Sequence, residues 1–213
     1  MKQIFLMLFA VALFTACNDD QKSANTSAEH HHEAGEEHDH EANKHEDHDH
    51  STHDHGSSTL QNREIKATTN KNSATGAIVD AYIQIKNGLA NDNSKAASEG
   101  GKALITAFSK FDMSKLGKEE HEEYMDIVED AKEQAEHIEK SPMDHQREHF
   151  EVLSTDINDL IALLGTDKTL YQDFCPMANN GKGAIWISEV EVIKNPFFGS
   201  KMPKCGKVQK KIN

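Results

Sequence analysis

The densest set of possible metal ligands in the chain is a histidine-rich segment near the amino terminus. Residues 30–55 hold 10 of the 14 histidines, interleaved with nine Asp or Glu residues and one Lys, so their net charge is −8. Neutral imidazole binds zinc, copper and nickel, and carboxylates add oxygen ligands and an attractive field. We predict Cu(II) or zinc binding of moderate affinity, because a flexible chain loses entropy whenever it wraps an ion. A solvated acidic tail is the alternative. The predicted ligands include His38, His40, His48, His50, His53 and His55.

A second set of candidate ligands lies near the carboxyl terminus, where each of two cysteines lies close to a methionine. Cys-Pro-Met at 175–177 and Met-Pro-Lys-Cys at 202–205 each place a thiol two or three residues from a thioether. Both groups are soft donors, which select Cu(I) over magnesium, calcium or manganese. A disulfide is an equally weighted alternative, because it would close a loop of about 30 residues and stabilise the fold by about 3–4 kcal/mol. The four sulfur residues are Cys175, Met177, Met202 and Cys205.

A third candidate is a pair of histidines in a segment with helical periodicity. His145 and His149 are four residues apart, so both rings project from one face of the predicted helix and could share a metal ion. The alternative is two surface histidines on a charged helix. We assign His121 and His137 to the solvated face, because Glu and Lys surround them in the sequence.

Motifs for catalysis are missing from the sequence. It contains no Gly-rich nucleotide-binding pattern and no HExxH pattern, and its two carboxyl-terminal cysteines are 30 residues apart rather than in a CxxC arrangement. The net charge of −13 argues against a nucleic-acid partner, since phosphate binding needs clustered Lys and Arg. We therefore expect a binding protein rather than an enzyme. An enzyme with a reactive cysteine is the weakest alternative.

The first residues have the layout of a lipoprotein signal peptide. Lys2 precedes an apolar run from Ile4 to Phe14, and these 11 residues are too few to span a bilayer as a helix. The small residues that follow predict cleavage after residue 16 and lipidation of Cys17; ordinary secretion with nearby cleavage is the alternative. We expect a lipid-anchored protein of the cell envelope, in the outer membrane and facing the periplasm or the cell surface.

The rest of the chain divides by its apolar pattern. Residues 17–73 show no apolar period and predict a disordered tether. Residues 74–165 predict an antiparallel four-helix bundle, in which Gly100 and Gly101 allow close contact between helices. The first predicted helix covers about residues 74–90, and the second is capped by Asp92 and reaches Phe111. The third covers about residues 118–140. The fourth is capped by Ser141, has Pro142 as its first residue and ends at Leu164.

The remaining residues, 166–213, change character. Residues 184–187 favour a strand and residues 190–193 suggest another. The fold class predicted is mainly α, with this small irregular or β tail packed on the bundle. The tail is too small to form its own core, so it must pack on the bundle or be held by a disulfide.

Several stretches resemble a known family. The stretches are HQREHF at 145–150, YQDFCPMAN at 171–179 with GAIWIS at 183–188, and NPFFGSKM at 195–202. They are similar to a domain of unknown function of Gram-negative envelope lipoproteins. The same domain occurs fused to periplasmic adaptor subunits of copper/silver efflux systems. The resemblance covers about residues 74–210.

The resemblance implies a role in heavy-metal resistance and favours a metal site over a disulfide at the four sulfur residues, completed by His145 or His149. It also implies an efflux adaptor as partner. The chain departs from the related small heavy-metal-binding domain, because Ala178 replaces the histidine after Cys-Pro-Met and the second half has one Cys instead of two. The leading hypothesis is a lipoprotein that sequesters or delivers copper. The alternative is a disulfide-stapled helical module that docks on an efflux or envelope protein.

Overall fold

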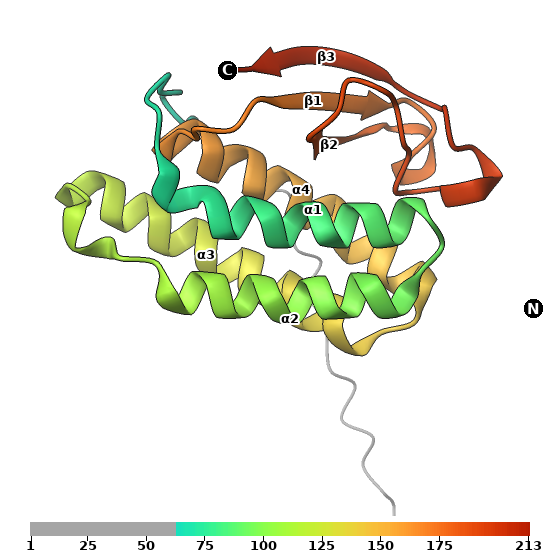
Figure 1. Ribbon diagram of the computed structural model, residues 1–213, viewed down its shortest axis with the longest axis horizontal. Coiled ribbons are helices and arrows are strands. Elements are labelled where there is room, and N and C mark those ends of the chain that lie inside the picture. Colours follow the sequence, from blue (N-terminus) through green and yellow to red (C-terminus); the bar gives the residue numbers. More distant parts are fainter. Residues whose placement is uncertain (1–62) are drawn as a thin grey trace, which may run out of the picture. The chain divides into compact units, whose positions relative to one another are not determined.

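The computed structural model describes residues 63–213, so the predicted signal peptide, the lipidation at Cys17 and the histidine-rich segment lie outside the described residues. The order of elements confirms the predicted mainly α fold with a small carboxyl-terminal β part (Figure 1). The helices are α1 (Gly76–Ala90), α2 (Ser94–Lys110), α3 (Lys118–Lys140) and α4 (Met143–Leu164). The strands are β1 (Leu170–Cys175), β2 (Ala184–Ser188) and β3 (Lys207–Ile212). The short 3-10 turns are η1 (Ser73–Thr75), η2 (Met113–Lys115), η3 (Asn179–Gly181) and η4 (Gly199–Lys201).

The four helices run alternately up and down and bury the apolar stripes that their sequences predict (Figure 1). Two glycines let the helices approach closely. A Cβ atom on Gly100 would lie 2.7 Å from the backbone nitrogen of Ile85 in α1, and one on Gly101 would lie 2.8 Å from the carbonyl oxygen of Ala135 in α3. The predicted close contact is therefore confirmed. None of the helices in the described part of the chain is long and apolar enough to cross a membrane.

The start of α2 differs from the prediction by one residue. Asn93 is the N-cap, and its Oδ1 accepts a hydrogen bond from the Ala96 N–H at 3.0 Å. Asp92, the predicted cap, has a φ of 54°. Its carboxylate accepts hydrogen bonds from Arg147 Nη2 at 2.6 Å and from the Ser200 N–H at 2.9 Å. The prediction was wrong because distant segments provide the partners of this carboxylate.

The start of α4 is also shifted by one residue. Pro142 occupies the N-cap position, and its carbonyl accepts from the Gln146 N–H at 2.9 Å. Ser141, the predicted cap, closes α3 instead, since its N–H donates to the His137 carbonyl at 3.0 Å. A residue that precedes proline is pushed into extended backbone, so Ser141 separates the two helices.

The three strands form one antiparallel sheet in the order β2-β1-β3. The strand predicted at 184–187 is confirmed as β2, whereas the one suggested at 190–193 is wrong. Ser188 ends β2, because its Oγ both donates to the Val190 carbonyl at 2.8 Å and accepts from the Val190 N–H at 3.2 Å. The free edge of β1 pairs with β3, a strand that sequence patterning did not predict because four of its six residues are polar or charged.

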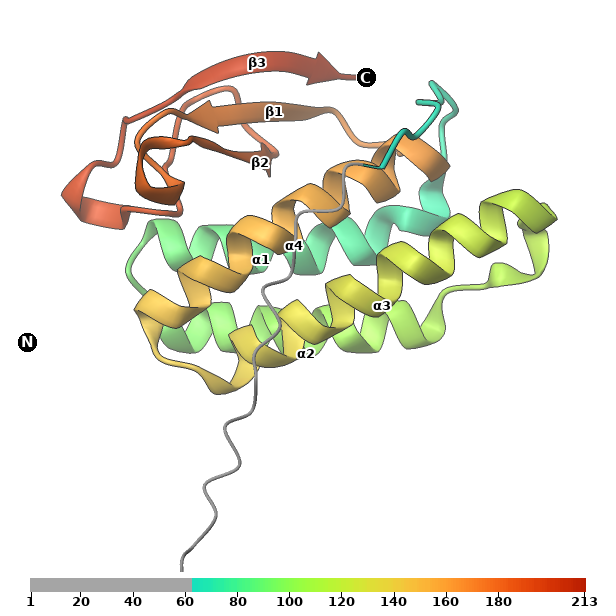
Figure 2. The same ribbon diagram turned by 180° about the vertical axis from the view of Figure 1, so that it is seen from behind.

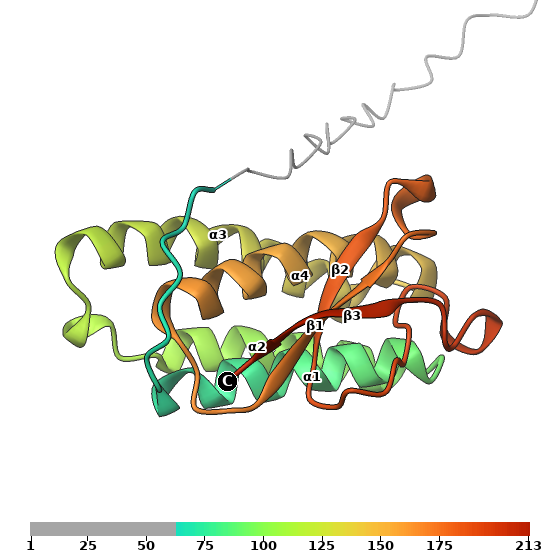
Figure 3. The same cartoon turned by 90° about the horizontal axis from the view of Figure 1, so that it is seen from above.

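The sheet packs on the bundle and crosses α1 and α4 obliquely when seen from above (Figure 3). Trp186 and Ile187 of β2 are completely buried there. The hydroxyl of Tyr82 in α1 lies 2.8 Å from Ser154 Oγ in α4 and accepts a hydrogen bond from the Ile187 N–H at 3.1 Å. The prediction that the tail packs on the bundle is therefore confirmed.

An extended segment ahead of η1 also belongs to the packed structure. The Arg63 guanidinium forms ion pairs with Asp130 of α3 and, at 2.8 Å, with Asp156 of α4. The Thr68 N–H donates to the Ala162 carbonyl at 2.8 Å and so pairs one of the open carbonyls at the end of α4. The predicted tether, residues 17–73, therefore includes residues that pack on the bundle. Among them, Thr68 donates a hydrogen bond to the end of α4.

Candidate functional site

The fold brings two cysteines together although 30 residues separate them in the sequence. Cys175 ends β1, and Cys205 lies two residues ahead of β3, the antiparallel neighbour of β1. Their Sγ atoms are 3.3 Å apart, and both are free thiols. Cys175 is completely buried, whereas Cys205 is partly exposed. A metal ion or an oxidant can therefore reach the pair from the Cys205 side.

The loop that carries Cys205 is held by a buried asparagine. Asn195 Nδ2 donates to the Cys205 carbonyl at 2.6 Å, and the Asn195 N–H donates to the Pro203 carbonyl at 3.1 Å. Its Oδ1 accepts from the Phe197 N–H at 2.8 Å. From the sequence, Asn195 was placed only at the start of the NPFFGSKM stretch, with no structural role. The signal that could have found its role is the Asn-Pro pair, which is typical of a turn closed by the asparagine side chain.

The predicted sulfur residues lie in two loops that meet at this end of the sheet. The Cys205 N–H donates to the Met202 carbonyl at 3.1 Å, which closes a turn. The contact with Cys175 raises the pKa of the Cys205 thiol, burial raises it further, and a hydrogen bond from the Met177 N–H lowers it. The Met177 amide thus lies beside Cys205 Sγ, while the Met177 side chain is 55 % exposed.

The residue after Cys-Pro-Met takes part in the turn rather than in a ligand set. Ala178 is buried, and its carbonyl accepts from the N–H groups of Gly181 at 3.1 Å and Gly183 at 2.9 Å. A larger side chain at this position would have to open the turn. Ala178 is therefore a buried turn residue.

His145 and His149 are on α4, which lies beside α3 (Figure 2), and His149 contacts His137 and Gln134 of α3. His149 Nδ1 is 2.8 Å from Gln134 Oε1 of α3, and His145 Nδ1 is 3.0 Å from Glu148 Oε2. The structure brings the two histidines together, with ring centroids 5.1 Å apart. Within residues 63–213, no three side chains of His, Cys, Asp or Glu stand in a geometry ready to hold a metal ion.

The structure corrects the placement of His137. It was expected on the solvated face, but it is half-buried and stacks on His149, with ring centroids 4.2 Å apart. Helical periodicity groups residues of one helix, and it does not say which polar face meets a neighbouring helix. His121 is exposed, as predicted.

A buried ionisable group beneath the sheet was missed as well. The Lys86 side chain is completely buried, and its Nζ donates to Glu189 Oε2 at 2.7 Å. Asp173 of β1 is also completely buried, and neither carboxylate oxygen has a hydrogen-bond partner among the described residues. Burial raises the pKa of Asp173 to about 7, although Lys86 acts against the shift. Burial likewise lowers the pKa of Lys86.

Lys86, Asp173 and Glu189 line neither of two hollows on the surface of the described residues. One surface hollow of about 430 Å³ lies along α1 and the start of α2, and one of about 240 Å³ lies at the end of α4 beside β3. Other residues line both hollows. We therefore treat the Lys86 group as part of the contact between sheet and bundle and the thiol pair as the candidate site.

Fold and site together define a helical-bundle protein whose carboxyl-terminal sheet holds a pair of thiols. Residues 78–169 match the model of a family described as Protein of unknown function (DUF3347). The predicted resemblance to a domain of unknown function is confirmed for these residues. The match covers nearly all of the bundle and ends ahead of β1. No curated protein and no solved structure matches the chain.

Proposed function

We propose that this protein is a lipid-anchored envelope protein that binds Cu(I) through Cys175 and Cys205 and sequesters it or delivers it to a heavy-metal efflux adaptor. The observation that carries the proposal is the 3.3 Å distance between two free thiols, one at the end of β1 and one in the loop ahead of β3. Thiolate and thioether ligands favour soft ions such as Cu(I) over magnesium, calcium or manganese. The two loops bring Met177 and Met202 to the same end of the sheet.

Binding at this pair is coupled to protons. The pKa of Cys205 is raised, so metal binding must displace the proton of that thiol, and affinity increases with pH. The nearby chain carries Lys201, Lys204 and Lys207, which balance the negative charge that two thiolates and one monovalent ion would leave. No acidic side chain lies between residues 194 and 213.

The sulfur atoms need only a small adjustment to hold an ion. With metal–sulfur bonds of about 2.3 Å and a tetrahedral angle, two ligand sulfurs lie about 3.8 Å apart. The observed distance is 3.3 Å. Cys175 is set by the pairing of β1, whereas Cys205 lies in a partly exposed loop and can make the movement.

The histidine-rich segment has a complementary role in this proposal. Residues 30–55 would collect Cu(II) or zinc near the membrane through imidazole and carboxylate ligands. The folded domain would hold the reduced ion through sulfur. Lipidation of Cys17 would keep both at the envelope. In this function the protein binds and transfers ions, and it catalyses no reaction.

The test is a Cu(I) titration of the full-length reduced protein against a chromophoric Cu(I) chelator, without oxygen. Cys205→Ser is the informative variant, because the residue is only partly buried and the change is nearly isosteric. We expect one tightly bound Cu(I) in the wild type and its loss in Cys205→Ser. Met125→Leu, at an exposed methionine of α3, is the matched control and should bind as the wild type does. Equal Cu(I) affinity in wild type and Cys205→Ser contradicts the proposal.

A disulfide-stapled docking module is the second candidate, and the same short thiol distance supports it. Oxidation would close the loop of about 30 residues and stabilise the tail by about 3–4 kcal/mol. Thiol counting on protein equilibrated with oxidised glutathione, with and without Cu(I), separates the candidates. A bridge that persists when Cu(I) and a reductant are supplied supports the docking module. If Cu(I) protects both thiols from alkylation, the metal site is supported.

A further inference from the structure

The outer edge of the sheet is basic. β3 is an edge strand, since the sheet has the order β2-β1-β3. Residues 194–213 contain six lysines and no acidic residue, whereas residues 63–193 contain 14 Lys or Arg against 24 Asp or Glu, a net charge of −10. All six lysines are exposed, and within residues 63–213 none of them forms an ion pair. Three of the six, which we call the lysine edge, are on β3: Lys207, Lys210 and Lys211.

The exposed face of α3 has the opposite charge. Six exposed carboxylates follow one another at alternating intervals of three and four residues, so they form one stripe along the helix. Like charges at this spacing destabilise a helix, so helix stability does not explain the stripe. Glu122 and Glu136 pair with lysines of the same helix, at 3.9 Å and 3.2 Å. The members of this acidic stripe are Glu119, Glu122, Asp126, Glu129, Glu133 and Glu136.

The lysine edge and the acidic stripe lie on different sides of the domain. The sheet packs on α1 and α4, whereas α3 packs on α2 and α4. Figures 1 and 2 both show β3 as the outermost strand and α3 beyond α4, away from β3. The lysine edge therefore cannot reach the acidic stripe of its own chain. It can reach the acidic stripe of a second copy.

We infer that the domain associates head to tail, with the lysine edge of one copy docked on the acidic stripe of the next. The central carboxylates of the stripe, Asp126, Glu129 and Glu133, have no ion-pair partner among the described residues. They extend over about 10 Å of helix at 1.5 Å per residue. The lysine edge extends over about 13 Å of strand at 3.3 Å per residue, so the two charged rows have similar lengths.

The same lysines exclude the other way in which two copies could meet. Lysines on an edge strand oppose pairing of that strand with a second β3, because like charges would face each other. Contact through side chains with an acidic helix has no such repulsion. Because the two surfaces differ, each copy keeps one free surface, and association continues into a ring or a short chain. This inference goes beyond the proposed Cu(I) site and does not depend on it.

Sedimentation velocity of the full-length protein at two salt concentrations tests the inference. Charges act over about 30 Å at 0.01 M salt and over about 3 Å at 1 M. We expect the sedimentation coefficient to rise with protein concentration at low salt, and the dissociation constant to increase by about tenfold or more at high salt. Association through apolar segments does not weaken with salt, so the salt-dependent part is the readout.

Reversal of the lysine edge is the first variant. We expect it to abolish the salt-dependent association, and it consists of Lys207→Glu, Lys210→Glu and Lys211→Glu. The matched control makes the same change of charge at three exposed lysines of α2 and should associate as the wild type does. It consists of Lys95→Glu, Lys102→Glu and Lys110→Glu.

Reversal of the acidic stripe is the second variant, and it should also abolish the association. It consists of Asp126→Lys, Glu129→Lys and Glu133→Lys. A third variant combines the reversals of β3 and α3. It keeps the net charge of −13 and exchanges the signs of the two surfaces, so it should associate again with the same salt dependence. Far-ultraviolet circular dichroism checks that each variant is folded.

Three outcomes overturn the inference. The first is a wild type that shows no salt-dependent association. The second is association that is lost on reversal of the lysine edge but kept on reversal of the acidic stripe, which would assign the lysines to a different acidic occupant. The third is a folded combined variant that stays monomeric. Cys205→Ser should associate as the wild type does, so failure of the thiol site is recognised separately.

Discussion

The interior of the bundle and the interface between bundle and sheet are both buried, but they are built from different contacts. Within the bundle, apolar stripes meet directly and Gly100 lies against a neighbouring backbone. Beneath the sheet, polar groups are buried as well, including the Tyr82–Ser154 hydrogen bond, Lys86 and Asp173. Apolar contacts do not titrate, whereas buried ionisable groups link stability to protonation. The chain therefore holds its helices together by tight packing and positions its sheet by polar contacts.

The largest effect should come from the side chain that fills the sheet interface. Trp186 is completely buried and meets the Phe197 ring at 5.9 Å. We expect Trp186→Ala to lower the free energy of unfolding by about 3–5 kcal/mol, because apolar burial is lost and a cavity remains. Urea unfolding followed by far-ultraviolet circular dichroism measures it.

The control for this change is Val192→Ala, at a position that is 68 % exposed, with an expected effect within about 0.5 kcal/mol. A wild-type unfolding midpoint for the helices of Trp186→Ala would mean that the sheet unfolds on its own. The two regions would then be independent rather than parts of one cooperative unit.

The next effect concerns close packing inside the bundle. Gly100→Val should lower the free energy of unfolding by about 1–3 kcal/mol, because the new side chain would overlap the backbone of Ile85. Gly76→Ala is the matched control, since its Cβ would meet only Lys168 Cε at 3.8 Å. That change should be neutral or stabilising by up to about 1 kcal/mol, the helical preference for Ala. Equal denaturation midpoints for both variants would contradict the close contact.

A smaller and pH-dependent effect should distinguish the sheet interface. The pKa of Asp173 is about 7 in the folded protein, against 3.8 ordinarily. Between about pH 4 and pH 7 the folded state keeps a proton that the unfolded state has lost, so the contribution of this group to stability falls as the pH rises. Asp173→Asn cannot lose that proton, so we expect it to be more stable than the wild type at pH 8 by on the order of 1–2 kcal/mol.

Urea midpoints measured from pH 4 to pH 8 check this prediction, because the difference between variant and wild type should grow across that range. Asp126→Asn, at an exposed position of α3, is the control and should show no such growth. Parallel curves for wild type and Asp173→Asn would contradict the prediction that Asp173 makes the stability of the fold depend on pH.

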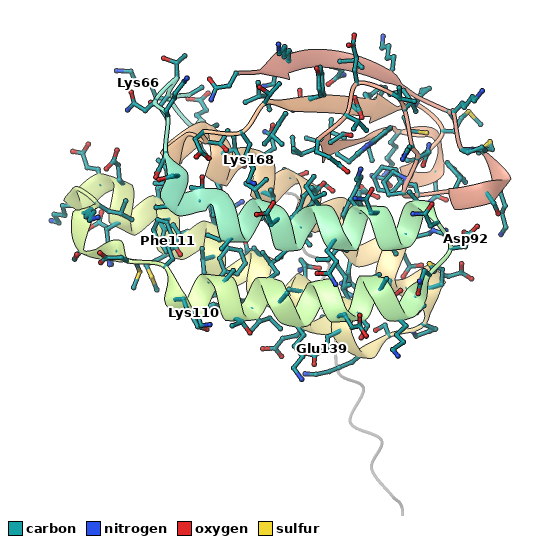
Figure 4. All side chains as sticks on the ribbon, in the orientation of Figure 1. Lys66, Asp92, Lys110, Phe111, Glu139 and Lys168 are labelled. Carbon is teal, nitrogen blue, oxygen red and sulfur yellow. The ribbon has the colours of Figure 1, made fainter. Side chains whose placement is uncertain are left out.

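The smallest effect is expected at the edge where the α1–α2 turn meets η4. Figure 4 shows Asp92 at this turn. Hydrogen bonds from Ser200 and from Arg147 hold the pKa of Asp92 below its usual range. A depressed carboxyl pKa stabilises the fold above about pH 4, and the contribution disappears as the pH falls through the lowered value.

Asp92→Ala should therefore lower the thermal unfolding temperature slightly at pH 7 and less in acid. Asp167→Ala, another exposed aspartate, serves as the control for a general charge effect. A larger decrease in the unfolding temperature in acid than at neutral pH would contradict a lowered pKa for Asp92.

Much of the bundle could be predicted because helical periodicity is local. The helix expected at 118–140 has these bounds, and the one expected at 74–90 begins at Gly76 after the η1 turn. The prediction failed where distant residues provide the partners. Asp92 contacts α4 and η4 rather than capping α2, and Arg63 packs on the bundle although its neighbours look like a tether.

The types of candidate ligand could be read from the sequence, but their grouping could not. Thiol and thioether residues in two short motifs predicted a shared sulfur site, and the fold brings the thiols to 3.3 Å. The same reasoning placed His137 on the solvated face, yet it stacks on His149. Which faces meet depends on the rotation of one helix against another, and no local pattern records it.

By itself the sequence determined four amphipathic helices, a carboxyl-terminal β part and the chemical nature of the possible ligands, because these follow from short-range spacing and side-chain type. Only the tertiary structure decided which thiols and imidazoles lie together, how β3 pairs with β1, and which charged groups are buried beneath the sheet. These outcomes depend on contacts between segments tens of residues apart, whose geometry is established only when the whole domain packs.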